Sequence, residues 1–307
     1  MNDRRLNHTP KIWAIGGGKG GVGKSLVSIL IATELARRNQ KTILIDADLG
    51  GANLHTMMGI KTPGRTLNDF VTRKYGSMEE ICIQTAVNHL QLICGASEIL
   101  SLANPQYAQK NKIVQNLTHL AAEHVILDLG AGTSYNVLDF FLIADNPIIV
   151  VTPQPISIQN AYGFIRNAIY RKLSRIAGQQ TSLLNLIRTA MDPKNESQMR
   201  TIQDLFGAVD QSYNPTVMQQ LRNAVQKIRP WVVTNLAREK RDHNAGRIIR
   251  LVAEKYLTIR VEELGCISYD PMVEQTVSYM KPLSALSKQS AARKDAEHLV
   301  QRLVSSA

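Results

Sequence analysis

The chain has 307 residues, of which 44% are hydrophobic and 20% charged, and its formal net charge is +11. Such a composition supports a substantial hydrophobic core, in one large domain or two small ones. It excludes a membrane-spanning protein, because no apolar stretch approaches the ~20 residues of a transmembrane helix, and we expect no signal peptide. The three cysteines show no CxxC spacing, which indicates unpaired thiols in a reducing cytoplasm and argues against an iron–sulfur carrier.

A glycine-rich loop follows the first predicted strand. Residues 1–11 form a polar lead-in that we expect to be mobile, residues 12–15 are predicted to form a buried strand, and residues 26–37 have a helical pattern. The sequence between strand and helix, GGGKGGVGKS at positions 16–25, contains the full GxxxxGK[ST] pattern of a phosphate-binding loop. A plain glycine-rich turn is the alternative, and the complete pattern in a strand–loop–helix context argues against it.

Each residue type in this loop has a role in binding a nucleotide. Glycines leave the backbone N–H groups free to surround phosphate oxygens, and the start of the helix adds its positive dipole end. Lys24 can reach the β and γ phosphates, and the Ser25 hydroxyl can ligate Mg²⁺. The predicted nucleotide-binding residues of the loop are Gly18, Gly20, Gly21, Val22, Gly23, Lys24, Ser25 and Leu26.

The string KGGVGKS at positions 19–25 resembles the deviant nucleotide-binding loop of the MinD/ParA ATPases. In that family the first lysine of the string reaches across a dimer to the ATP of the partner, which implies this catalytic role for Lys19. The resemblance also implies ATP or ADP and Mg²⁺ as cofactors, and a homodimer that forms with ATP. A solvated surface lysine is the alternative for Lys19 taken alone.

Two aspartates follow the next predicted strand, residues 42–45, at the edge where a parallel sheet binds its ligand. The string DADLGGAN at positions 46–53 resembles the switch I segment of MinD and of the FlhG subgroup of the family. This resemblance implies that Asp48 orients the attacking water and contributes to the metal site, with Asp46 in support. It also implies that Asn53 lies near the phosphates or the dimer face. Taken alone, such aspartates are often helix caps.

A third aspartate ends the strand predicted at residues 124–128. An apolar run followed by Asp128 is the pattern of a Walker B strand, in which the carboxylate holds Mg²⁺, often through water. The sequence LGAGTS at positions 129–134 supplies a switch II loop and matches the D-x-x-A-G element of the family. We therefore predict that the metal is held by Ser25, Asp48 and Asp128.

A helical insertion interrupts the family pattern. Helices are predicted at residues 106–122 and 136–144, and a strand at 147–152, before about fifty residues, 176–230, intervene ahead of the next family strand. A helix-to-strand connection lies at the edge opposite the ligand crevice, so we expect the insertion to bind a partner. The equally supported alternative is that the inserted helices only pack on the domain and bind no partner. The helical patterns of the insertion cover residues 182–190, 197–208 and 215–228.

Two later segments are predicted to bind the adenine base. Asn235 ends a predicted strand, and its side-chain amide can bond a donor and an acceptor of adenine together. The string LGCISYDP at positions 264–271 resembles the loop that lines the base pocket in the family. This resemblance implies that Asp270 and Pro271 contact the nucleotide.

The last helix and the charge distribution indicate which partners are compatible with the chain. Residues 288–304 form an amphipathic helix that we expect to pack on the sheet, because Asp295 and Glu297 oppose binding to an anionic membrane.

Residues 163–260 contain seventeen basic and seven acidic residues, so this segment carries a net charge of +10. The excess fits DNA, an anionic membrane or an acidic protein face, and equally a solvated surface.

Together the motifs predict a doubly wound, mainly parallel α/β P-loop NTPase fold, as a single domain over residues 1–307. The resemblance implies slow, partner-stimulated hydrolysis of ATP to ADP and phosphate by a dimerising switch. The FlhG likeness suggests that the switch positions, or sets the number of, a flagellum-type or other polar machine, with a flagellar protein as regulator or cargo. The alternatives are a ParA-type partitioning ATPase on DNA and a nucleotide-bound scaffold with vestigial hydrolysis. We expect a cytoplasmic protein, associated in the ATP state with a pole, the nucleoid or the membrane.

Overall fold

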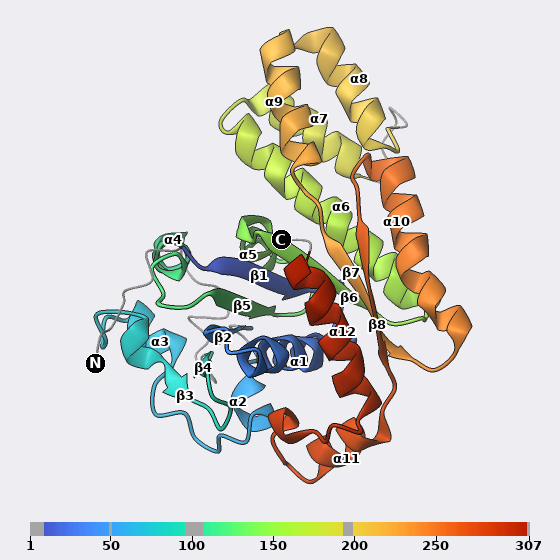
Figure 1. The fold of residues 1–307 in the computed structure, drawn as a ribbon. Helices are drawn as coiled ribbons and strands as arrows, with labels where there is room; N and C mark the ends of the chain where they lie inside the picture. The colour runs from blue at the N-terminus through green and yellow to red at the C-terminus, as the bar shows by residue number, and fades with distance from the viewer. Residues whose placement is uncertain (1–8, 49–50, 96–106, 193–198, 306–307) are drawn as a thin grey trace.

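The computed structural model describes residues 9–48, 51–95, 107–192 and 199–305 (Figure 1). Four of the predicted features extend outside the described residues. They are the lead-in (residues 1–8), two positions of the switch I string (49–50), and the first residues of the helices predicted from 106 and from 197.

The described strands form one sheet in the order β3-β4-β2-β5-β1-β6-β7-β8. Neighbouring strands are parallel except β3 and β4, which form an antiparallel pair. Because β1 lies inside the sheet and helical connections lead away from it on both sides, the doubly wound, mainly parallel α/β fold is confirmed. The strands are β1 Lys11–Gly16, β2 Thr42–Ala47, β3 Ile83–Gln84, β4 Leu90–Ile93, β5 His124–Leu129, β6 Asn146–Val151, β7 Trp231–Ala237 and β8 Glu262–Ser268.

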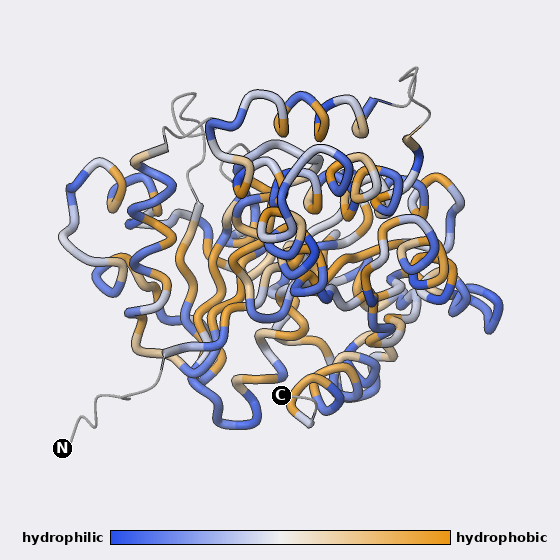
Figure 2. Tube along the Cα trace, turned by 90° about the horizontal axis from the view of Figure 1, so that it is seen from above, coloured by the Kyte–Doolittle hydropathy of each residue, from blue (hydrophilic) through white to orange (hydrophobic). Residues whose placement is uncertain are grey.

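Helices cover both faces of this sheet. Successive side chains of each strand point to opposite faces, so the apolar residues of one strand pack against helices on both sides. In β1, Ile12 and Ala14 join the hydrophobic cluster formed with α5, α6 and α10, whereas Trp13 and Ile15 join the cluster formed with α1 and α12. Figure 2 shows hydrophobic residues gathered along the strands. The helices are α1 Lys24–Arg37, α2 Leu54–Met57, α3 Leu67–Val71, α4 Tyr107–Leu117, α5 Tyr135–Ile143, α6 Pro155–Ala177, α7 Thr181–Met191, α8 Ile202–Ser212, α9 Pro215–Gln226, α10 Asn244–Leu257, α11 Pro271–Ser278 and α12 Ala291–Ser305. Short 3₁₀ turns are η1 Glu79–Ile81, η2 Lys240–His243 and η3 Leu283–Ala285.

The insertion consists of α7, α8 and α9, which lie beyond one end of the sheet (Figure 1). Helix α6 starts after the carboxyl end of β6 and leads to α7, and α9 leads to the amino end of β7, so the three helices are at the amino edge of the sheet. Helix α8 ends four residues later than predicted, at Ser212. It starts at a capping box, in which Thr201 accepts a hydrogen bond from the Asp204 N–H at 3.1 Å.

The C-terminal helix α12 packs on the sheet beside α1 (Figure 1). Five of its apolar residues are buried, and Gly265 of β8 permits the close approach, since a Cβ there would lie 2.6 Å from Leu299 Cδ2. No described helix is long and apolar enough to cross a membrane. The buried residues of α12 are Ala292, Ala296, Leu299, Val300 and Leu303.

Candidate nucleotide-binding site

The glycine-rich loop occupies residues 17–23, between β1 and α1, and its backbone requires glycine. Gly21 and Gly23 have φ angles of +80° and +87°, in the left-handed region that other residues rarely adopt. A Cβ on Gly18 would lie 2.2 Å from the Asn160 carbonyl oxygen of α6, which shows that the loop abuts that helix. Gly20 and Gly21 are exposed, whereas Val22 and Leu26 are buried beneath the loop. The backbone of the loop is therefore accessible at Gly20 and Gly21, as binding of an anion by its N–H groups requires.

The two lysines of the loop differ in their surroundings. Lys24, the first residue of α1, is 8% exposed, and burial lowers the pKa of its ammonium although the charges of Asp128 and Asp48 raise it. Lys19 is exposed on the surface of the loop. One lysine is therefore held inside its own site, and the other is available to a second molecule.

Asp128 ends β5 beneath the start of α1 and is 3% exposed. Its Oδ1 accepts a hydrogen bond from the Ser28 hydroxyl at 2.8 Å, and its side chain is also hydrogen-bonded to Ser25. Burial raises the pKa of Asp128 to about 6. Ser28 was not predicted from the sequence, although it lies one helical turn after Lys24 and so faces the same side.

Asp46 and Asp128 lie directly opposite each other in the register of β2 and β5. Asp46 is 1% exposed, accepts hydrogen bonds from the backbone N–H groups of Leu54 (3.0 Å) and Asp48 (3.2 Å), and burial raises its pKa to about 7. Asp46 thus fixes the segment that carries Asp48. The half-buried Asp48 lies against switch II, since a Cβ on Gly130 would be 3.0 Å from Asp48 Oδ1.

The predicted base-binding residue Asn235 lies directly behind the loop. Its side chain is fully buried, and Nδ2 donates a hydrogen bond to the Val22 carbonyl oxygen at 2.9 Å. Oδ1 is buried and has no hydrogen-bond partner among the described residues. A bulge follows, at which Leu236 takes a left-handed φ of 59° and is 38% exposed, a strain typical of functional sites.

The other predicted site residues lie on two loops at the same edge of the sheet. Asn53 is exposed, and its Nδ2 donates to the Gly51 carbonyl oxygen at 2.8 Å. Asp270 is buried and caps α11 by accepting from the Met272 N–H at 2.8 Å, while Pro271 is the exposed first residue of that helix. Contact of these residues with a nucleotide stays a prediction.

A model of the ParA family, described as NUBPL iron-transfer P-loop NTPase, matches residues 8–170. The chain belongs to the ParA family of P-loop NTPases. The matched part contains the glycine-rich loop and all three aspartates, Asp46, Asp48 and Asp128.

Three relatives of this ParA-family chain show how far the likeness extends. The antiactivator FleN of Pseudomonas aeruginosa is 28% identical over 229 residues, covering 72% of this chain and 79% of FleN. The flagellum site-determining protein YlxH of Helicobacter pylori is 33% identical over 158 residues, and the chain spans 53% of its length. The septum site-determining protein MinD of Pyrococcus horikoshii, complexed with Mg-ADP, has a TM-score of 0.64 at 17% identity, covering 96% of each chain, which shows a shared fold.

The chain belongs to a family of P-loop NTPases, and its residues fit ATP or ADP together with Mg²⁺. The loop surface above Gly21 is open, with no atom within 4 Å of a Cβ placed there, and Asn235 Oδ1 offers a buried acceptor. Among the described residues, no group of three or more His, Cys, Asp or Glu side chains is placed to hold a metal ion. Mg²⁺ commonly takes one or two protein ligands plus phosphate oxygens and water, a role for Ser25 and Asp128.

Proposed function

We propose that this chain is an ATP-dependent dimerising switch that positions, or sets the number of, a cellular machine of the flagellar type. The relatives FleN and YlxH support this proposal, because FleN is an antiactivator and YlxH is a flagellum site-determining protein. The chain acts as a slow ATP hydrolase whose turnover a partner protein stimulates. It works in the cytoplasm, and its ATP state gathers at a pole or another cellular surface.

The contrast between the two loop lysines carries the proposal. Lys24 is buried next to Asp128 and Asp48, so it serves the phosphates of its own site. Lys19 is exposed at the same loop, within reach of a second molecule that approaches the phosphates. A second copy of the chain, facing the first across the nucleotide, completes both sites at once.

The remaining residues take the roles that their positions support. Lys24 and the loop N–H groups stabilise negative charge on the transferred phosphoryl group. Asp48 orients the attacking water and contributes with Ser25 and Asp128 to the site that would hold Mg²⁺, which would neutralise phosphate charge. Asp46 keeps Asp48 in place through the backbone hydrogen bonds that it accepts.

Light scattering coupled to size exclusion tests the dimer. With Mg²⁺ and ATP, an Asp48→Ala chain that retains ATP is expected to run at twice the mass that it shows with ADP. Adding Lys19→Ala should return it to the monomer mass without loss of ATP binding, whereas Lys227→Ala on the exposed end of the insertion should not. A Lys19→Ala chain that still dimerises with ATP would refute the role of Lys19.

A ParA-like, DNA-associated ATPase is the second candidate function, favoured by the exposed cations of η2 and α10. Arg238, Lys240 and Arg247 are exposed there. Double-stranded DNA of unrelated sequence should then bind only with ATP, and the affinity should fall steeply with salt. Absence of DNA binding in the ATP state would remove this candidate and leave the flagellar-type switch.

The third candidate, a scaffold with vestigial hydrolysis, is tested by turnover. If wild type and Asp48→Ala hydrolyse ATP at equally negligible rates with and without candidate partners, the scaffold replaces the switch. Iron transfer, the activity in the description of the matched family model, is not extended to this chain. Its three cysteines, Cys82, Cys94 and Cys266, have no CxxC spacing, so the paired cysteines of a metal-cluster carrier are missing.

Localisation of a fluorescent fusion separates a pole, the nucleoid and the membrane as the site of the ATP state. A pattern that Lys19→Ala and Lys24→Ala leave unchanged would contradict the switch.

A further inference from the structure

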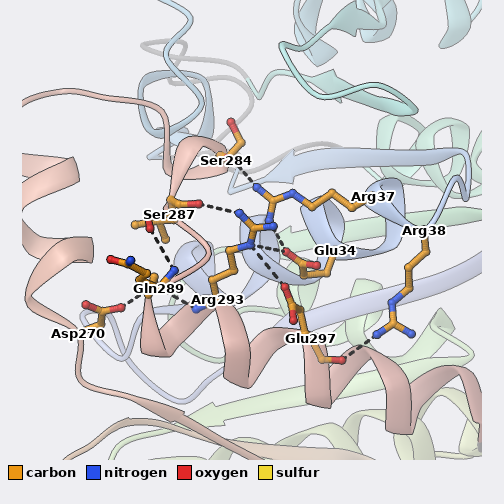
Figure 3. Close-up of polar contacts among 11 residues, drawn as sticks. Glu34, Arg37, Arg38, Asp270, Ser284, Ser287, Gln289, Arg293 and Glu297 are labelled. Atoms are coloured by element: carbon orange, nitrogen blue, oxygen red, sulfur yellow. Dashed lines mark hydrogen bonds and ion pairs between the residues drawn. The ribbon is translucent and has the colours of Figure 1, made fainter.

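Helix α12 connects the two halves of the nucleotide site. The close-up in Figure 3 shows polar contacts between α12, the helix α1 that follows the phosphate loop, and the Asp270 region. None of these bonds joins α1 directly to the loop 268–271. Residues of α12 lie between the two and are bonded to both. The contacts on each side can be followed separately.

On the side of the loop 268–271, two helix caps are bonded to each other. Asp270 Oδ1 accepts from the Met272 N–H and so caps α11, while Oδ2 accepts from the Ser290 hydroxyl at 2.5 Å and the Ala292 N–H at 3.2 Å. Ser290 is fully buried and caps α12, because its Oγ accepts from the Arg293 N–H at 3.2 Å. One carboxylate therefore lies at the positive ends of two helices.

A second bond fixes the start of the same loop. Asp295, one turn into α12, accepts a hydrogen bond from the Ser268 N–H at 2.8 Å. The residue after Ser268, Tyr269, donates its N–H to the Ala237 carbonyl oxygen at 2.8 Å, two residues beyond Asn235. The loop is thus held between α12 and the end of β7, and it follows Ile267, which lies opposite Asn235 in the register of β7 and β8.

On the opposite side, α12 is bonded to α1. Arg293 Nε lies 3.6 Å from Glu34 Oε1, a carboxylate on α1 that is itself paired with Arg37. Arg38, the residue that follows α1, donates to the Glu297 carbonyl oxygen at 2.9 Å. Figure 3 shows these side chains converging between the two helices. The position of α12 is therefore set by the helix that begins at Lys24.

We propose that Ser290 and Asp295 are positioning residues that hold the loop 268–271 against the nucleoside half of the bound nucleotide and so determine its affinity. The proposal rests on the proposed nucleotide site and deepens it. A purely structural role for α12 makes a different prediction. Loss of either side chain would then lower the free energy of unfolding, and it would not weaken binding of the nucleoside half more than binding of the phosphate half.

Calorimetry with two probes separates these roles. Mg-ADP occupies the phosphate loop and the nucleoside site, whereas Mg-pyrophosphate occupies the phosphate loop alone. Ser290→Ala is expected to weaken ADP binding about fivefold, which corresponds to about 1 kcal/mol at 1.4 kcal/mol for each factor of ten. Pyrophosphate binding should stay within about twofold. Asp295→Asn should give the same selective loss, and Ser290→Thr, which keeps the hydroxyl, should restore ADP affinity.

Thr201→Ala is the matched control, because Thr201 caps α8 in the insertion with the same chemistry, accepting from the Asp204 N–H at 3.1 Å. It should lower the melting temperature as Ser290→Ala does and leave both affinities unchanged. Equal ADP affinity in Ser290→Ala and Thr201→Ala, or parallel losses for ADP and pyrophosphate, would overturn the positioning role. If Lys24→Ala left pyrophosphate binding intact, the proposed nucleotide site itself would fail, a result distinct from either.

Discussion

The two edges of the sheet bury different kinds of side chain. At the carboxyl edge, Asp46, Asp128 and Asn235 are all at most 3% exposed, and each is held by hydrogen bonds. At the amino edge, the insertion buries residues such as Leu183 and Leu221 and leaves its charged residues at the surface. Burying a carboxylate costs free energy unless it is compensated, whereas burying leucine is favourable. The difference teaches that the first edge buries polar side chains at a cost in stability, and that the second is stabilised mainly by apolar packing.

The strongest test of this contrast compares two lysines. Lys24→Ala should lower the rate of ATP hydrolysis by about 1,000-fold, because it removes the buried cation aimed at the phosphates. Lys227→Ala, at the exposed end of α9, should leave the rate within about twofold of wild type. Steady-state phosphate release measures both. Comparable losses in the two variants would break the distinction between the edges.

The next largest effect is on the pH dependence of stability without nucleotide. Burial raises the pKa of Asp128 from 3.8 to about 6, so the folded chain binds a proton that the unfolded chain has lost between these values. The free energy of unfolding should therefore fall as the pH rises from 4 to 6, by about 2 kcal/mol for this group, since the slope reaches at most 1.36 kcal/mol per pH unit. Asp46 contributes in the same direction up to about pH 7.

Urea unfolding at pH 4 and pH 8 measures this fall, and Asp128→Asn should reduce it. The control is Asp210→Asn, an exposed position on α8 that should leave the fall unchanged. An Asp128→Asn chain whose stability falls with pH as steeply as wild type would show that burial of this carboxylate is compensated in the folded protein.

Removal of the water-orienting carboxylate should have a somewhat smaller effect. Asp48→Asn is expected to lower kcat about 100-fold and leave the affinity for ATP close to wild type, because the phosphate loop remains intact. Asp210→Asn again serves as the matched substitution in the insertion. Rapid-quench measurement of the hydrolysis step, together with ATP titration, distinguishes a lost catalytic group from lost binding.

The smallest effect is expected in the insertion itself. Thr201→Ala removes the cap of α8 and should lower the free energy of unfolding by about 1 kcal/mol, with kcat for ATP unchanged. Thermal unfolding and turnover are measured on the same preparation. A substantial drop in kcat would show that the insertion communicates with the site by more than packing.

The sequence predicts best what local pattern determines. The glycine loop between β1 and α1 and the strand that carries Asp128 are predicted correctly, because the order of strand, loop and helix is visible in the chain. Ser28 and the Asp46–Leu54 bond were missed, since both depend on how α1 and the 48–54 segment lie on the sheet. The capping role of Asp270 was missed for the same reason, because Ser290 is twenty residues away in sequence.

Helix α6 runs from the carboxyl edge of the sheet, at the phosphate loop, to the amino edge, at the insertion. It begins beside the phosphate loop, where the Asn160 carbonyl oxygen abuts Gly18, and its 23 residues end at the insertion. At 1.5 Å per residue the helix is about 34 Å long, so a tilt of about 5° at the loop moves its far end by about 3 Å. We expect γ-phosphate binding to be detectable as a changed distance between spin labels on α1 and α9. Identical distances with ADP and ATP would show that α6 does not act as a lever.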